Sequence, residues 1–308
     1  MKKRVLYGTD IDALPIALGT ADFGAKVSRE DAYYMMDRFL DMGGSIIDTA
    51  LIYSDWIPGE RSRSEKTIGA WLKKSGKRSE VIISTKGAHH DIENGNAPRL
   101  RREDILGDIE KSLMHLGCGV IDIYWLHRDC IDMEVGGIVE TLDYIVRSGK
   151  ARYCGVSNWT AARIAEANRF AEEHGLYPIC ASQIQYNIAD NVPEVEDKTL
   201  VAMNDAEYGV YKQTKMPVFA FSAQAKGFFT KLDKMGAEEL SKTPYAKYLT
   251  DRNKEIYNHL KEVSLDSGVS VNAAAVAELI RTSDFQVVPI AGCRTVEQLE
   301  DTMTAVNI

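Results

Sequence analysis

The sequence has few of the features that mark special classes of protein. Its 308 residues hold no apolar run near the roughly 18 residues that a membrane span needs, and no proline- or serine-rich linker divides them. The five cysteines are odd in number and widely spaced, and no pair has zinc-ligand spacing, so neither a disulfide framework nor a zinc site is indicated. We expect one domain over residues 1–308, cytoplasmic, with reduced thiols, no bound metal and no membrane partner.

Positive charge is also scarce. The 37 Lys and Arg residues are outnumbered by 45 Asp and Glu residues, which gives a net charge of -8 and disfavours nucleic acid as a partner. Hydrophobic residues make up 45% of the chain, enough for a large core. A small molecule is therefore the expected partner, and the sequence leaves the oligomeric state open.

Eight short apolar runs alternate with amphipathic segments of helical period. Strands alternating with helices predict a parallel sheet buried on both faces, and eight such units favour an α/β fold closed into a (β/α)8 (TIM) barrel. The predicted strands are 16–19, 45–48, 81–85, 121–126, 151–157, 179–185, 217–221 and 286–290, and the clearest predicted helices are 28–42, 102–116, 134–148 and 160–174. Ser28 and Thr160 are expected N-caps, and glycines 43, 117, 149 and 175 are expected helix ends.

Three segments lie outside this repeat. Residues 4–14 predict a β-hairpin cap across the N-terminal mouth of the barrel. Residues 223–253 predict a long loop after strand seven, which we interpret as a lid over a bound cofactor, because loops of that length are usually functional. The acidic run 194–197 is expected to begin a solvated helix.

Four reactive side chains follow consecutive predicted strands. Asp48 ends strand two, Lys86 follows strand three and His127 ends strand four, while Tyr53 lies in the loop after Asp48. Because the C-terminal ends of barrel strands meet at one rim, these four side chains can converge. Each one alone has a structural explanation as a turn cap, a solvated rim lysine, a packing tyrosine or a hydrogen-bonding histidine. Together they indicate a catalytic site.

Tyrosine beside lysine is a specific way to make a proton donor. A free phenol has a pKa of about 10, and a nearby ammonium group lowers that pKa toward the working range. Asp48 would keep Lys86 charged, and His127 would donate a hydrogen bond on the other side of a carbonyl oxygen. No side chain supplies hydride, so a nicotinamide cofactor is the simplest source.

Further polar and aromatic residues flank this rim. His89 and His90 are adjacent and would point to opposite faces of a strand, which disfavours zinc. A mixed polar and aromatic rim suits sugars or their derivatives. The candidate substrate-binding residues are Trp56, His89, His90, Arg128 and Asp129, with Trp125 as a further candidate.

The chain resembles the aldo-keto reductase superfamily. The matching segments, in family order over almost the whole chain, are GGSIIDTALIY, IISTKG, SLMHLGCGVIDIYWLHRD, GKARYCGVSNW, SQIQYN and VVPIAGCRTVEQLED. The resemblance implies that Asp48, Tyr53, Lys86 and His127 form a catalytic tetrad, with Tyr53 as the general acid.

The same resemblance implies a cofactor site, in which Asp48 also takes part. Gly19, Thr20 and Ala21 match the approach to the nicotinamide ribose, and Ser157, Asn158 and Gln183 match the carboxamide contacts, although Ser157–Asn158 can also cap the next helix. Phe221 matches the ring that stacks on nicotinamide, and Ser222 begins the pyrophosphate loop. The residues that match the adenosine end are Gly292, Cys293, Arg294, Gln298 and Thr302.

Arg294 suits a 2′-phosphate, so NADP(H) is the preferred cofactor, with NAD(H) left open. Gln298 and Thr302 depart from the basic residue and the asparagine that the family often has there. GxGxxG, the Rossmann fingerprint, is absent.

The leading hypothesis is an NADP(H)-dependent oxidoreductase that reduces an aldehyde or ketone, of a sugar or polyol derivative. One alternative is a cofactor-sensing regulatory barrel with little turnover. Another is a non-redox lyase or isomerase barrel in which Lys86 forms a Schiff base.

Overall fold

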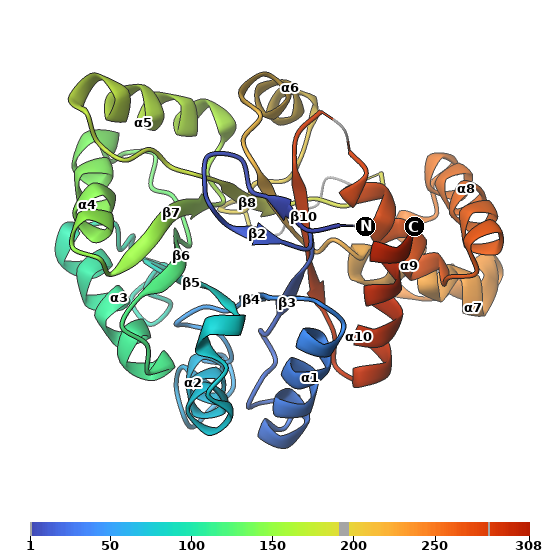
Figure 1. Ribbon diagram of the computed structural model, residues 1–308. Coiled ribbons are helices and arrows are strands. Elements are labelled where there is room, and N and C mark those ends of the chain that lie inside the picture. Colours follow the sequence, from blue (N-terminus) through green and yellow to red (C-terminus); the bar gives the residue numbers. More distant parts are fainter. Residues whose placement is uncertain (1, 191–196, 283) are drawn as a thin grey trace.

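A computed structural model describes residues 2–190, 197–282 and 284–308, and its centre is a closed barrel of eight parallel strands (Figure 1). Each strand neighbours the next one in the sequence, and the last closes on the first, so the predicted (β/α)8 barrel is confirmed. The barrel strands are β3 (Ala17–Gly19), β4 (Ile46–Asp48), β5 (Ile82–Gly87), β6 (Ile121–Leu126), β7 (Ala151–Ser157), β8 (Ser182–Gln185), β9 (Val218–Phe221) and β10 (Val287–Gly292).

Helices cover the outside of this barrel (Figure 1). The α-helices are α1 (Arg29–Asp41), α2 (Arg63–Ser75), α3 (Arg102–Leu116), α4 (Val135–Arg147), α5 (Ala161–His174), α6 (Asp205–Thr214), α7 (Phe228–Leu240), α8 (Asp251–Ser267), α9 (Val271–Ile280) and α10 (Val296–Met303). Short 3-10 turns are η1 (Arg78–Glu80), η2 (Ala225–Gly227), η3 (Pro244–Tyr248) and η4 (Thr304–Asn307).

The helix ends follow the expected chemistry. The side chains of Ser28 and Thr160 accept hydrogen bonds from backbone N–H groups in the first turns of α1 and α5. Gly117 and Gly175 end α3 and α5 with φ of 62° and 65°, a left-handed conformation that glycine adopts without strain. These local signals mark the starts of α1 and α5 and the ends of α3 and α5.

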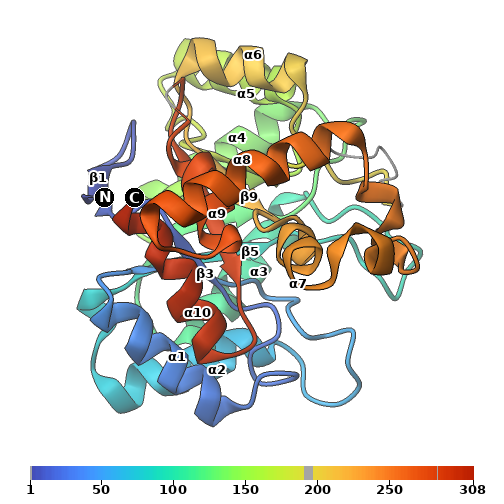
Figure 2. The ribbon, with the colours of Figure 1, turned by 90° about the vertical axis from the view of Figure 1, so that its right-hand side faces the viewer.

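A hairpin closes the N-terminal end of the barrel, as predicted. Strand β1 (Arg4–Val5) pairs antiparallel with β2 (Asp12–Ala13). Between them, Leu6 and Ile11 are buried in the inner cluster that also contains Ala17 of β3. Figure 1 shows the hairpin over the barrel centre, and Figure 2 shows it at the opposite end of the barrel from α7. The other end is therefore the one available for a site.

The connection after β9 is long, but it is not the predicted loop. Residues 225–248 contain η2, α7 and η3, and α8 follows directly. Phe228, Phe229 and Leu232 of α7 are buried in an apolar cluster with Leu260 of α8 and Ala274 of α9. Burial of these apolar side chains against α8 and α9 stabilises the helix α7. The glycine content of residues 223–253 alone predicts a loop instead.

The acidic run 194–197 lies outside the described residues except for Asp197, so the predicted helix start is not tested. Across the described ranges no single helix has the length and apolar composition to cross a membrane; the pair α8 and α9, bent by 99°, meets the test by length and composition only.

Strand register brings the expected residues to one rim. Gly19 is the partner of Asp48, and Asp48 is the partner of Ser84. On the far side of the barrel, Ser157 pairs with Gln183. All of these positions lie at or near the C-terminal ends of parallel strands, where barrels of this kind carry their sites.

Candidate active site

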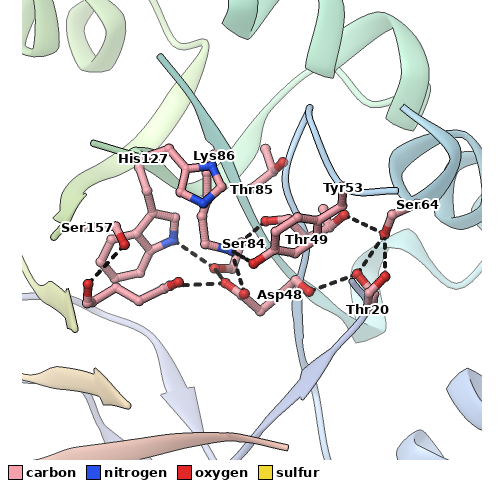
Figure 3. Close-up of polar contacts among 12 residues, drawn as sticks. Thr20, Asp48, Thr49, Tyr53, Ser64, Ser84, Thr85, Lys86, His127 and Ser157 are labelled. Atoms are coloured by element: carbon pink, nitrogen blue, oxygen red, sulfur yellow. Dashed lines mark hydrogen bonds and ion pairs between the residues drawn. The ribbon is translucent and has the colours of Figure 1, made fainter. Parts of the chain in front are cut away.

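Asp48 is the centre of a buried polar cluster at the C-terminal rim (Figure 3). One carboxylate oxygen, Oδ2, accepts a hydrogen bond from Lys86 Nζ at 2.6 Å. The other, Oδ1, accepts from Ser84 Oγ at 2.7 Å and from Gln183 Nε2 at 3.2 Å. Trp125 Nε1 in turn donates to Ser84 Oγ at 2.8 Å. The carboxylate is thus held from three sides and cannot rotate freely.

Lys86 uses all three of its ammonium hydrogens within this cluster. Besides Asp48, Nζ donates to the Thr49 carbonyl oxygen at 2.7 Å and to Tyr53 Oη at 3.0 Å. Burial opposes a charge here, but Asp48 and Tyr53 outweigh it and raise the pKa of Lys86. Lys86 is therefore a fixed cation beside the phenol.

The phenol of Tyr53 keeps its proton in this environment. Burial raises the pKa of Tyr53, and the opposing effect of Lys86 is smaller. This corrects the expectation that the ammonium group brings the pKa of the phenol down toward neutrality: the cost of burying a phenolate is the larger effect. A protonated phenol at neutral pH is the form that a proton donor needs.

His127 lies on the other side of Tyr53. The two ring centroids are 5.9 Å apart at an interplanar angle of 74°. Burial lowers the pKa of His127 well below its usual value, and the nearby Arg128 adds to the effect. Its Nδ1 is buried and has no hydrogen-bond partner within the described ranges. The imidazole is therefore neutral and can offer one N–H to a ligand.

Three amide and hydroxyl side chains line the rim next to the tetrad. Ser157 Oγ donates to the Gln183 carbonyl oxygen at 2.9 Å, and Asn158 Nδ2 donates to the His127 carbonyl oxygen at 3.2 Å. Asn158 has a φ of 60°, unusual for a residue other than glycine and common at functional sites. Asn158 does not cap α5, because the N-cap is Thr160. Of the side chains expected to hold a carboxamide, Gln183 thus contacts Asp48, Asn158 contacts the His127 backbone, and Ser157 contacts the Gln183 backbone.

The loops after β3 and β4 are tied together by hydroxyl groups. Thr20 Oγ1 donates to the Asp48 carbonyl oxygen at 2.8 Å and contacts Ser64 Oγ at 2.8 Å. Ser54 Oγ, next to Tyr53, donates to the Ala21 carbonyl oxygen at 2.8 Å. Thr20 is fully buried, so its side chain positions these loops. Ser54 and Ser64 were not identified from the sequence, which carries no signal for them.

The residues expected at the adenosine end differ in exposure. The Arg294 side chain is 65% exposed, and its Nε donates to Asp22 Oδ2 at 3.2 Å. Its backbone N–H donates to Gln298 Oε1 at 2.9 Å. Cys293 and Thr302 are buried, and Gln224 donates to Thr302 Oγ1 at 3.1 Å. Arg294 is free to meet a ligand, whereas Cys293 and Thr302 face the protein interior.

Phe221 and Ser222 connect these two ends of the rim. Phe221 ends β9 and is half-buried, packed against the inner cluster of the barrel. Ser222 has a φ of 55° and begins the turn that leads to η2. Gly292 is exposed at the end of β10. Because β9 and β10 are neighbouring strands, these residues lie at the same rim as the tetrad.

Four of the five expected substrate residues lie in three different surroundings. The rings of Trp56 and His89 face the tetrad, with centroids 6.4 Å from Tyr53 and 4.8 Å from His127, respectively. His90 Nε2 contacts the Asp129 carbonyl oxygen at 3.2 Å. Asp129 itself forms an ion pair with Arg163 of α5 at 2.9 Å. Asp129 is therefore turned toward a helix and has a structural partner.

Trp125, the further candidate, supports the polar cluster around Asp48. Its side chain is fully buried inside the barrel, with its ring centroid 5.0 Å from that of Phe219. The donation from Trp125 to Ser84 makes both of them supports of Asp48. Ser84 was overlooked, although it lies two residues before Lys86 on a strand and must face the same side.

No group of three or more His, Cys, Asp or Glu side chains comes together as a metal site in the part of the chain that the structure describes. Burial raises the pKa of the Cys180 thiol to about 12 and that of Cys293 to about 11, so neither is a reactive thiolate at neutral pH.

Comparisons with known proteins agree with this geometry. The profile of the aldo/keto reductase family matches residues 15–308. Norsolorinic acid reductase stcV of Emericella nidulans is 29% identical over 315 residues, which cover 96% of this chain and 74% of that protein. An aryl-alcohol dehydrogenase of Pestalotiopsis microspora is 26% identical, covering 96% and 75%. The uncharacterized oxidoreductase YrpG of Bacillus subtilis is 28% identical, covering 100% and 92%.

Proposed function

Because this chain belongs to the aldo/keto reductase family, and is by that relationship an oxidoreductase, we propose that it reduces an aldehyde or ketone to the alcohol with Tyr53 as proton donor. The observation that supports this most directly is the contact of 3.0 Å between Tyr53 Oη and Lys86 Nζ, with Lys86 paired to buried Asp48. Hydride on the carbonyl carbon and one proton on its oxygen complete the reaction.

Each residue of the tetrad has its own role in this reaction. Tyr53 gives its proton to the carbonyl oxygen, and Lys86 stabilises the phenolate that results. Asp48 keeps Lys86 charged and aimed at the phenol. His127, neutral and next to Tyr53, offers a hydrogen bond to the same carbonyl oxygen, which orients the substrate.

We propose NADP(H) as the preferred cofactor, with NAD(H) as the lesser one. A bound nicotinamide nucleotide supplies the hydride. The donor set fits such a group: Gln183 is buried beside Asp48, and its Oε1 accepts no hydrogen bond within the described ranges, which leaves an acceptor for a carboxamide. Exposed Arg294 is suited to a 2′-phosphate.

We propose that the substrate carries an aromatic ring or a polyol chain. Trp56 is 53% exposed beside Tyr53, and His89 lies against His127, so flat rings are available for stacking. One relative is named an aryl-alcohol dehydrogenase. Aryl aldehydes therefore join sugar derivatives among the compounds to be tested.

The Schiff-base alternative is disfavoured by the geometry of Lys86. A nucleophilic lysine must lose its proton, but the Lys86 ammonium group donates to three oxygens and its pKa is raised. A cofactor-sensing barrel with little turnover is distinguished by single-turnover absorbance, because a sensor would bind NADPH without oxidising it.

The deciding experiment compares wild type with Tyr53→Phe. Fluorescence titration with NADPH and NADH should show retained cofactor binding, while reduction of a panel of carbonyls falls at least about 100-fold, since general acid catalysis is lost. Tyr34→Phe is the matched control, because Tyr34 is 56% exposed on α1. Full activity in Tyr53→Phe would remove the proton-donor assignment.

A further inference from the structure

Arg128 places a positive charge at the mouth of the site. It directly follows His127 at the C-terminal end of β6, and its Nη1 donates to the His127 carbonyl oxygen at 3.0 Å. Trp159 Nε1 fixes the backbone by donating to the Arg128 carbonyl oxygen at 3.3 Å. After burial, Arg128 is the largest cause of the lowered pKa of His127, and its charge also acts on Tyr53. The guanidinium group therefore lies close to the reacting groups.

This guanidinium group is buried, and most of its N–H donors make no hydrogen bond to the residues that the structure describes. The Arg128 side chain is only 12% exposed. Of its five N–H donors, the described residues engage one, through His127, and its ion-pair partner Asp197 lies 3.6 Å away, beyond a good hydrogen bond. A buried cation is costly unless it is paired and hydrogen-bonded. The described residues thus leave donors of Arg128 available to an anionic ligand.

Asp197 is a weak partner for Arg128. Its side chain is 47% exposed, and its Oδ1 already accepts hydrogen bonds from Thr199 N and Thr199 Oγ1, at 2.9 and 2.6 Å. Its Oδ2 meets the guanidinium group only at 3.6 Å, a loose ion pair beyond the distance of a good hydrogen bond. An incoming oxyanion can compete with Asp197 for the guanidinium group at small cost.

Two other charged groups at this rim are already paired. Lys86 is paired with Asp48 at 2.6 Å, and Asp129 is paired with Arg163 at 2.9 Å. Burial lowers the pKa of His89 to about 4, so His89 is neutral at pH 7. A ligand at this mouth therefore meets one under-used cation, Arg128, in the part of the site that the structure describes.

We infer that Arg128 selects carbonyl substrates that also carry a carboxylate or phosphate. Its planar guanidinium group can bind such an anion through two parallel hydrogen bonds. This inference rests on the proposed function and adds the class of substrate to it. It makes Arg128 a specificity-determining residue, with Asp197 as the group that the substrate anion displaces.

Matched pairs of aldehydes test the inference. Succinic semialdehyde and butanal share a four-carbon chain and differ in a terminal carboxylate, and glyceraldehyde 3-phosphate and glyceraldehyde differ in a phosphate. Wild type should show a kcat/KM at least about tenfold higher for the anionic member of one pair or both, and the two pairs distinguish carboxylate from phosphate. Tenfold corresponds to about 1.4 kcal/mol.

Variants separate a specific effect from a general one. In Arg128→Gln the ratio of kcat/KM between anionic and neutral aldehydes should fall at least about tenfold, mainly through KM, and Arg128→Lys should restore part of it. In Asp197→Asn the ratio should rise, because a competing charge is removed. Arg281→Gln is the matched control: Arg281 also has an ion pair of 3.6 Å, but it ends α9. An unchanged ratio in Arg128→Gln, or a wild-type preference for neutral aldehydes, overturns the inference.

Failure of the proposed reductase function can be distinguished from failure of the inference about Arg128. If no aldehyde is reduced although NADPH binds, succinate is titrated by calorimetry into the NADP⁺-loaded protein. Succinate affinity that falls at least about tenfold in Arg128→Gln supports the anion site even without turnover. Equal succinate affinity in wild type and Arg128→Gln overturns it.

Discussion

Ser84 and Lys86, two residues apart on β5, hold the two oxygens of one carboxylate. Ser84 Oγ donates to Asp48 Oδ1 at 2.7 Å, and Lys86 Nζ donates to Asp48 Oδ2 at 2.6 Å. Because alternate residues of a strand face the same side, a single strand both orients Asp48 and supplies the cation that faces Tyr53.

Lys86→Met should lower the reduction rate about 100-fold or more, because the phenolate of Tyr53 loses its stabilising charge. It should also lower the free energy of unfolding by about 3–5 kcal/mol, since Asp48 would be buried without a partner. Urea denaturation and steady-state kinetics measure the two effects. The double variant Lys86→Met/Asp48→Asn should recover stability but not activity; recovery of both would contradict the role given to Lys86.

The pH dependence of reduction should lack an acid-side transition near pH 6.5, because the pKa of His127 lies well below its ordinary value. On the alkaline side the rate should persist until Tyr53 ionises above its usual pKa of about 10. Measurement of kcat/KM from about pH 5 to 10.5 tests both limits. A transition near pH 6.5 that disappears in His127→Gln would show that the imidazole is not neutral in the free protein.

Acid should destabilise the fold partly through His89. Its folded pKa of about 4 lies below the unfolded value of 6.5, so the unfolded chain binds the proton more readily. Neutral His89 makes its full contribution to the free energy of unfolding above pH 6.5. This contribution is lost as the pH falls toward 4, by up to about 3 kcal/mol. Urea denaturation at a series of pH values should show a shallower loss in His89→Gln than in wild type. Identical slopes would indicate that His89 is protonated in the folded state.

Arg294→Ala should weaken NADPH binding about 10- to 100-fold and affect NADH far less, because only NADPH carries the 2′-phosphate. Asp22→Asn should strengthen NADPH binding about two- to fivefold, since the carboxylate 3.2 Å from Arg294 Nε would no longer oppose a phosphate. Fluorescence titrations measure both. Equal losses of affinity for NADPH and NADH in Arg294→Ala would mean that this arginine does not bind the 2′-phosphate.

Trp125→Phe should lower the rate a few-fold without loss of cofactor affinity. The substitution keeps an aromatic ring beside Phe219 but removes the N–H that donates to Ser84 Oγ, at a cost of about 1 kcal/mol. Rates and unfolding free energies are compared with those of Trp71→Phe, which removes a buried indole N–H that donates to Asp37 Oδ1 at 3.3 Å on the outer helices, away from the rim. A larger effect on cofactor binding than on rate would argue against a link through Asp48.

The barrel and its four central residues could be predicted because their signals are local. Strands β6 and β7 have the bounds that their apolar runs predicted, and Asp48, Lys86 and His127 each end such a run or follow it directly. Parallel strands then bring them together without further information.

Contacts between distant segments could not be predicted in the same way. The helix α7 depends on Leu260 and Ala274, which lie in later helices. The partner of Asp129 is Arg163, and the partner of Thr302 includes Gln224, 78 positions away in the chain. A side chain at a rim can turn to a helix as easily as to a ligand, and sequence spacing does not distinguish the two.

The hairpin β1–β2 has a consequence for the apolar interior of the barrel. Leu6 and Ile11 cover its N-terminal end and pack in one cluster with Ala17. Because the inside of such a barrel is a packed core, deletion of the hairpin would expose apolar side chains to water at that end, far from the polar rim that carries Asp48.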